Sequence, residues 1–308
     1  MVAFCLSVKY NLNNYFNKTN KMKALIPIFL SGLLIPMSTW ACINTYTIEL
    51  SPHEFESAQQ RIQYYQDELD HFQRESEKPY SVQTQNDYAV LLILTGRYQQ
   101  AIEVLEKLER HHPHYLPKTA VNLGTAYELM GKLPQARKWI RVGMQRDPNI
   151  HEGSEWIHMN ILNAKLNHAD VNWLNQHPLL NLKFGQGYFP QPNHLQQNQL
   201  DHSQLEKIFE QAKLQVAERK RFVFGQDPIL ARVYYDLANI EQSLYLDQWL
   251  SRIQYNPEAN DLIRFSQVLG LQQDATIQKR IKMIESSKLV RLWMQIQDYM
   301  MLWMHKDK

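Results

Sequence analysis

Two stretches of the chain align with each other at a constant offset of 35 residues. The matched positions carry glycine, alanine, an aliphatic residue and proline in the same order. They are Gly96, Ala101, Leu105 and Pro113 in the first stretch, and Gly131, Ala136, Ile140 and Pro148 in the second. An offset of this size is typical of arrays in which each unit is a pair of helices that buries its apolar face on the next unit. The sequence therefore predicts two stacked helical hairpins, and with them a binding scaffold.

Glycine and proline mark the turns and the ends of the two units. Gly96 and Gly131 each follow an apolar helical face, where a residue that accepts positive φ ends a helix at low cost. Pro113 and Pro148 close the units, because proline cannot donate a hydrogen bond into a continuing helix. Two unrelated hairpins with coincidental glycine and proline are the alternative.

The second unit resembles a tetratricopeptide repeat. From Asn122 to Ala136 it has the leucine-glycine pair, tyrosine, glycine and alanine of that family, and Pro148 follows. The first unit resembles it less closely, with Tyr88-Ala89 in place of leucine-glycine. In both units a small residue, Ala89 or Gly124, stands where two helices are expected to cross closely. The resemblance covers residues 82–148.

The resemblance implies an all-α fold, a tetratricopeptide-like helical-hairpin solenoid with degenerate C-terminal helices. No segment shows a sustained alternation of apolar and polar residues bounded by turn signals, so we expect no sheet from about residue 53 onward. Such a solenoid is expected to bind a protein or peptide partner in its groove.

The usual register of the family implies which side chains face that groove. Asn122 falls where such proteins often hold the main chain of a ligand, and an extended peptide needs such donors and acceptors to be gripped independently of its side chains. The set expected to face the groove consists of Asn86, Val90, Ile93, Lys118, Asn122, Thr125 and Glu128. Solvated positions without a ligand are the alternative for these residues.

An export signal is predicted at the N-terminus. Lys21 and Lys23 precede an apolar run over residues 24–37, which ends in Ser38-Thr39-Trp40-Ala41. A basic start, a short apolar stretch and a small residue at the cut form a secretory signal. We therefore expect cleavage after Ala41 and a location in the periplasm or cell envelope, and we favour Met22 over Met1 as the true start. A buried core helix is the alternative.

Removal of residues 1–41 would change the charge and leave one cysteine. The 33 basic residues lose four and the 31 acidic residues lose none, so the formal net charge falls from +2 to −2 and favours no nucleic-acid partner. Cys42 would then be the first residue. Lipidation there is the less favoured alternative, because Thr39 and Trp40 stand where a lipobox has aliphatic and small residues.

Helical spacing continues on both sides of the repeats. Residues 51–76 predict a capping helix that begins at a Ser-Pro pair, with a coiled-coil dimer as the alternative. Residues 149–180 predict a degenerate third unit that has lost its second helix, and residues 203–308 a helical region with one repeat-like helix. The order of these blocks resembles an uncharacterised group of exported bacterial tetratricopeptide proteins, a resemblance that supplies no catalytic residue.

A long loop is predicted over residues 181–202. Glycine and proline are frequent in it and aliphatic residues are few. Tyr188 and Phe189 at its centre indicate a segment that packs onto something, either a partner or the chain's own groove.

No motif for catalysis is found. There is no glycine-rich phosphate loop, and His53-Glu54 lacks the second histidine of a zinc motif. His111, His112 and His114 cluster around Pro113, but a polar helix end explains them, so we expect no metal site and no cofactor. The favoured function is an exported interaction scaffold rather than an enzyme. A hydrolase-like cell-envelope enzyme that uses the solenoid as a frame is the alternative.

A C-terminal helix is predicted over residues 289–304, too short and too charged to span a membrane. One apolar stripe is expected to dock on the preceding helices: Leu289, Leu292, Trp293, Ile296, Met300 and Trp303. The flank, represented by Met294 and Met301, is expected to have fewer neighbours and to dock a partner or a second copy of the chain. A stripe buried wholly by neighbouring helices is the alternative.

Overall fold

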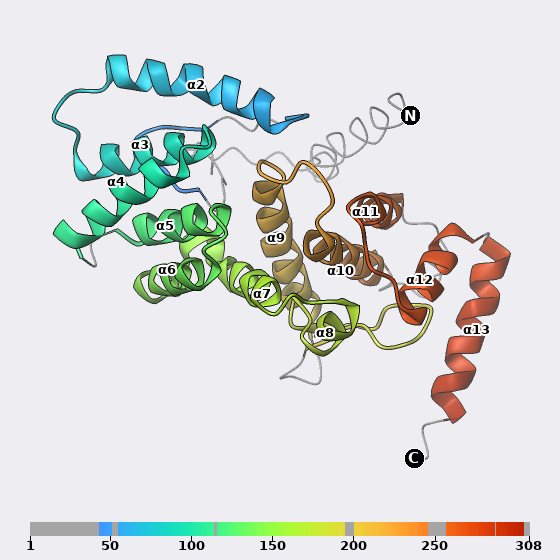
Figure 1. Cartoon of the computed structure of the whole chain (residues 1–308). Helices are drawn as coiled ribbons and strands as arrows, with labels where there is room; N and C mark the ends of the chain where they lie inside the picture. Colours follow the sequence, from blue (N-terminus) through green and yellow to red (C-terminus); the bar gives the residue numbers. More distant parts are fainter. Residues whose placement is uncertain are drawn as a thin grey trace, which may run out of the picture.

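A computed structural model describes residues 43–50, 55–113, 116–194, 200–245, 257–286 and 288–304 (Figure 1). The described chain is mostly helical, which confirms the predicted all-α class. The predicted export signal, its cleavage site and Cys42 lie outside the described residues, as do the Ser51-Pro52 pair and His114.

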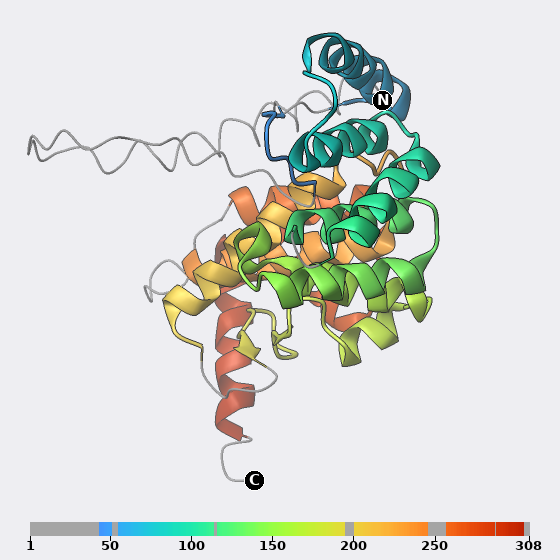
Figure 2. The same ribbon diagram turned by 90° about the vertical axis from the view of Figure 1, so that its left-hand side faces the viewer.

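The N-terminal half is a row of antiparallel helices. The helices of the two predicted hairpins are α3 (Val82–Leu94) with α4 (Tyr98–His111), and α5 (Pro117–Leu129) with α6 (Leu133–Arg146). Figure 2 shows them stacked in sequence order. Helix α2 (Ala58–Glu75) lies over α3 at the end of the row.

The hairpins pack closely because small residues stand at the helix crossings. A Cβ atom added at Gly124 would lie 2.6 Å from Ile140 Cδ1, and one at Gly143 would lie 2.4 Å from Val121 Cγ2. Ala89, Ala101 and Ala136 are fully buried. At these positions the two backbones approach without a side chain between them.

The turns use glycine in the left-handed region. Gly96 has φ +79° and Gly131 has φ +74°, as expected for residues that end a helix. Because no heavy atom would lie within 4 Å of a Cβ added at Gly131, the effect of a substitution there comes from the backbone alone.

We expect Gly131→Ala to lower the free energy of unfolding by about 1 kcal/mol, because positive φ is a strained backbone conformation for alanine. Gly225→Ala is the matched control, because Gly225 also has an open surrounding but no positive φ. Urea unfolding of both variants measures the difference. Equal midpoints for the two variants would contradict the backbone explanation.

Helix α2 begins later than predicted and makes an additional contact. Its N-cap is Ser57, whose side chain accepts a hydrogen bond from the Gln60 amide. Tyr65 and its apolar neighbours one and two turns further on are buried, as the helical spacing predicts. Arg61 is also buried, donates to the main-chain oxygen of Arg221 at 3.0 Å and lies over the Phe222 ring. Helix α2 therefore packs on the turn after α9 as well as on the first hairpin.

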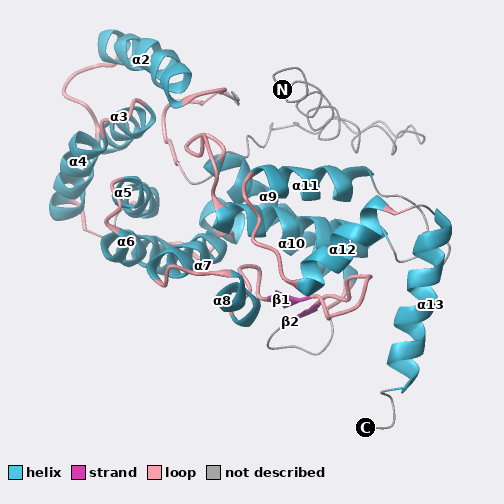
Figure 3. Cartoon of the chain, turned by 45° about the vertical axis from the view of Figure 1, so that its right-hand side comes forward, coloured by secondary structure: helices cyan, strands magenta, loops and turns pink. Residues whose placement is uncertain are grey.

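The C-terminal half is a second helical layer, which Figure 3 shows beside the hairpins. It begins with the 3-10 helix η2 (Ile150–Gly153), α7 (Glu155–Leu166) and the six-residue α8 (Val171–Gln176). The following helices are α9 (His202–Arg219), α10 (Pro228–Tyr245), α11 (Pro257–Val268), α12 (Ala275–Glu285) and α13 (Lys288–Met304). Helix α7 contributes to the apolar clusters of both halves, through Leu162 on one side and Ile157 and Ile161 on the other.

The predicted long loop packs onto the chain's own C-terminal half. It contains two short strands that the sequence did not predict, β1 (Leu182–Lys183) and β2 (Asn193–His194), which pair antiparallel. Phe189 is buried, and its amide donates to Asp298 of α13 at 3.0 Å. Arg280 of α12 donates to the main-chain oxygens of Phe184, Gly185 and Gly187. The described part of the loop is thus held by C-terminal helices.

Helix α13 faces the opposite way from the prediction. The stripe expected to dock is exposed, with 80% of Leu289, 59% of Trp293 and 57% of Met300 accessible. Met294, expected to be exposed on the flank, is only 4% accessible, and the side chain of Met301 is not described. Asp298 is held by the loop, which fixes the opposite side of the helix against the protein. Among the described helices, none combines the length and apolarity needed to cross a membrane.

Candidate functional site

The N-terminal segment, residues 43–50, lies against α3 and α5 without regular secondary structure. It contributes Ile43 and Leu50 to the apolar cluster of the hairpins, and both side chains are almost fully buried. Its main chain is held by polar side chains of the two helices. We call Asn86, Asp87, Lys118 and Asn122 the main-chain site.

Asn122 binds both polar groups of one residue of the segment. Its Oδ1 accepts a hydrogen bond from the Asn44 amide at 2.8 Å, and its Nδ2 donates to the Asn44 carbonyl oxygen at 2.8 Å. Asn86 Nδ2 donates to the same carbonyl oxygen at 2.8 Å. Asn122 and Thr119 both donate to Asn86 Oδ1, which fixes the orientation of that amide. The two buried asparagines therefore present a fixed pattern of donors and acceptors to a peptide backbone.

Asp87 and Lys118 hold the next part of the segment. The Asp87 carboxylate accepts from the amides of Tyr46 and Thr47, at 2.8 and 2.5 Å, and from the Thr47 hydroxyl at 2.7 Å. Lys118 Nζ donates to the Thr45 carbonyl oxygen at 2.6 Å and lies 4.5 Å from the centre of the Tyr46 ring. Charged partners strengthen such hydrogen bonds, so Asp87 and Lys118 strengthen the contact between the two helices and residues 45–47 of the segment.

Burial shapes the electrostatics of this region. It lowers the pKa of Lys118, although the Asp87 carboxylate acts in the opposite direction. It also raises the pKa of Tyr46. Asp87 is fully buried, and its charge is balanced by the donors that converge on it.

The structure brings together three of the predicted groove residues, namely Asn86, Lys118 and Asn122. Val90 and Ile93 are fully buried in the apolar cluster to which Ile43 and Leu50 of the segment also belong. Thr125 is 5% accessible and is also buried.

Sequence reasoning missed Asp87, which stands next to Asn86 at the edge of a long apolar run in α3. An acid beside such a run was the available signal.

Glu128 was also predicted to face the groove, but its contacts place it in a different group of residues. Its carboxylate accepts from Arg219 and Lys165 at 2.9 and 2.8 Å and contacts His158 Nε2 at 2.7 Å. His158 Nδ1 contacts Glu155 at 3.0 Å, and Glu155 in turn contacts His151 Nδ1. We call Glu128, His151, Glu155 and His158 the histidine–carboxylate chain.

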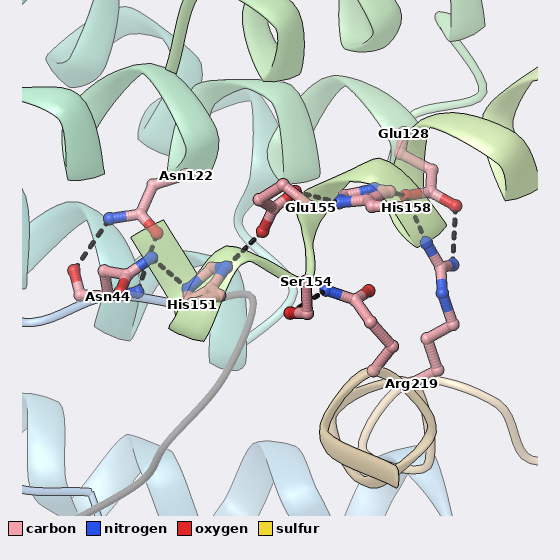
Figure 4. A network of polar contacts seen from close by, with 9 residues as sticks. Asn44, Asn122, Glu128, His151, Ser154, Glu155, His158 and Arg219 are labelled. Carbon is pink, nitrogen blue, oxygen red and sulfur yellow. Dashed lines mark hydrogen bonds and ion pairs between the residues drawn. The ribbon is translucent and has the colours of Figure 1, made fainter. Parts of the chain in front are cut away.

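The histidine–carboxylate chain runs from the N-terminal segment to helix α9, as Figure 4 shows. At one end His151 Nε2 contacts the side-chain amide of Asn44, and at the other end Arg219 pairs with Glu128. The side chains of His151, Glu155 and His158 are each 1% accessible. The chain therefore joins the segment, the second hairpin and the C-terminal half through buried polar contacts.

Within the histidine–carboxylate chain, the opposite charges of neighbouring groups stabilise one another. Burial alone would raise the pKa of Glu155, but His151 and His158 lower it to about 2. Burial opposes ionisation of Glu128 as well, yet Arg219, Lys165 and His158 hold its pKa well below the ordinary value. Burial would lower the pKa of His158, and the two carboxylates raise it above 6.5. Ionised carboxylates and a protonated His158 are thus the stable combination.

This combination predicts a defined pH dependence of stability. The depressed carboxylate pKa values stabilise the fold above about 4.5, and this contribution disappears as the pH falls through the folded values. The raised pKa of His158 stabilises the fold below about 6.5, and this contribution disappears as the pH rises through the folded value. We expect the contribution of the chain to be largest between these limits.

Urea unfolding between about pH 3 and about pH 9 tests this expectation. In the His158→Gln variant the decline above pH 6.5 should be smaller than in the wild type. His71→Gln is the control, because His71 is exposed on α2. A wild-type profile that is flat across neutral pH would contradict the assignment.

His111 is exposed and contacts the main-chain oxygen of Lys107, within its own helix. In the part of the chain that the structure describes, no group of three or more histidine, cysteine, aspartate or glutamate side chains is placed to hold a metal ion.

Comparison of the chain with protein-family models, curated proteins and solved structures finds no match.

Proposed function

We propose that the chain is an exported protein–protein interaction scaffold of the bacterial cell envelope. In this proposal the two hairpins are tetratricopeptide repeats, and the main-chain site binds a peptide segment of a partner protein. The constant offset of 35 residues supports the repeat assignment. The apolar run before Ala41 supports export.

One observation carries the proposal for binding. Asn122 engages both the amide and the carbonyl of a single residue, as would be needed to hold a peptide backbone whatever its side chains. Asn86 reinforces the contact from the preceding hairpin. Recognition through the main chain, with neighbouring side chains adding selectivity, is a general mode of peptide binding.

Binding is favoured over catalysis for a physical reason. The histidine–carboxylate chain has the residue types of acid–base chemistry, but His158 and Glu155 are 1% accessible and their ring nitrogens and carboxylate oxygens are engaged with one another and with neighbours. A general acid or base must reach the proton that it transfers. We therefore assign the histidine–carboxylate chain a stabilising and connecting role.

Crosslinking in the cell envelope, followed by capture of the tagged full chain, tests the proposed function. We expect Asn122→Ala combined with Lys118→Ala to lose partners that the wild type retains, because both side chains contact the bound main chain. Arg141→Ala is the control, since Arg141 is exposed on α6. Identical partners for all three proteins would contradict binding at the main-chain site.

A further inference from the structure

We propose that the N-terminal segment is an internal ligand of the main-chain site, and that the partner peptide competes with it by presenting the same side-chain pattern. The inference rests on the proposed function and adds to it the regulation of the site and the chemistry of the partner. Its basis is that the site is already filled by a segment of this chain.

The competition follows from the atoms that are used. Asn122 Oδ1 and Nδ2 are both engaged with Asn44, and the Asp87 carboxylate receives two consecutive amides and a hydroxyl. A second backbone cannot use the same atoms at the same time. A partner can therefore bind only in the fraction of molecules whose segment has left the site, and its apparent affinity falls by that fraction.

The contacts that hold the segment can also be made by a separate peptide. Side chains of α3 and α5 hold the main chain around Asn44, Thr45, Tyr46 and Thr47. These contacts require a backbone of suitable shape rather than covalent continuity with the scaffold. Tethering gives the internal segment a high effective concentration, so a free peptide must compete against it.

Four side chains of the segment define the pattern that the partner should carry. Ile43 is buried in the apolar cluster, and the side-chain amide of Asn44 contacts His151. The Tyr46 ring lies beside the Lys118 ammonium group, and the Thr47 hydroxyl donates to Asp87. We therefore infer a partner segment with an apolar residue, asparagine, any residue, an aromatic residue and threonine or serine in succession.

Fluorescence anisotropy with a labelled synthetic peptide tests the inference on the full chain. The probe has the sequence of residues 43–50. Asn44→Ala combined with Thr47→Ala weakens the internal ligand and leaves the main-chain site unchanged. We expect this variant to bind the probe at least about tenfold more tightly than the wild type, because more molecules have an open site.

Three controls accompany the measurement. Glu49→Ala changes an exposed side chain of the same segment and should bind like the wild type. Adding Asn122→Ala to the weakened variant should abolish binding. A probe in which alanine replaces the asparagine and the second threonine should bind at least about tenfold more weakly than the original to the weakened variant, since it lacks both side-chain contacts.

The outcomes separate this inference from the proposed function. Equal binding of the probe by the wild type and the weakened variant, with loss on Asn122→Ala, would overturn the internal ligand and leave binding at the main-chain site intact. Binding by neither protein, with circular dichroism unchanged, would overturn the inference, while the partner-capture comparison decides the proposed function. If the weakened variant loses its helical signal, Thr47→Ala alone takes its place, and binding no tighter than in the wild type would count against the inference.

Discussion

Replacing His158 by leucine should lower the free energy of unfolding by about 3 to 5 kcal/mol at pH 6, the cost of removing one partner from a buried charge pair. His158 lies between Glu155 and Glu128, at 3.0 and 2.7 Å, and its side chain is 1% accessible. Without the imidazole, both buried carboxylates lose a partner, and Glu155 keeps only His151 from this chain. Urea unfolding measures the change.

His71→Leu is the matched control for this variant, because it places leucine at an exposed histidine of α2. The control should change stability by less than about 0.5 kcal/mol, as is usual for surface substitutions. A loss below about 1 kcal/mol in His158→Leu would show that the chain of contacts contributes little beyond solvated polar groups.

Replacing Arg280 by alanine should lower the free energy of unfolding by about 3 kcal/mol, since one buried and two part-buried carbonyl groups would lose a charged donor. Arg280 is 3% accessible and donates to main-chain oxygens at Phe184, Gly185 and Gly187. These contacts hold the segment between β1 and β2 against α12. We expect the variant to lose hydrogen-exchange protection in residues 184–189 as well as global stability.

The controls for Arg280 separate charge from geometry. Lys282→Ala removes an exposed charge from the same helix and should be nearly neutral. Arg280→Lys should recover only part of the stability, because an ammonium group lacks the planar fork that reaches several carbonyls at once. Equal effects of Arg280→Ala and Lys282→Ala would contradict the proposed role of the guanidinium group.

The helical hairpins could be predicted from the sequence because their determinants are local. Gly96 and Gly131 end helices by adopting positive φ, and Gly124 allows a close crossing with Ile140. Each effect depends on residues within one or two units. Asn122 could also be proposed as a contact to a peptide backbone, since its place in the repeat resembles that of known binding residues.

The occupant of the site could not be predicted, because it depends on contacts between distant residues without periodicity. Asn44 lies 78 positions from Asn122, and Arg219 lies 91 positions from Glu128. In segment 43–50, Tyr46, Ile48 and Leu50 alternate with polar residues, but this spacing does not identify α3 and α5 as the neighbours of the segment. Such pairings follow from how the two halves pack together.

Helix α13 shows a second limit of pattern analysis. Its spacing correctly predicted an amphipathic helix, but the stripe with the most apolar residues is exposed and Met294 is buried. A helical pattern indicates which residues share a face. The neighbour that covers a face is set by tertiary contacts, here by the hydrogen bond from the Phe189 amide of the loop to Asp298 of α13.

Hydrogen exchange of the Asn44, Tyr46 and Thr47 amides in the wild-type chain tests the central claim most directly. These three amides donate to Asn122 and Asp87, so they should exchange much more slowly than in a free peptide of the same sequence. Asn122→Ala should speed exchange at Asn44 while the amides of α3 remain protected. Exchange of all three amides at the free-peptide rate in an otherwise protected wild-type protein would contradict the account.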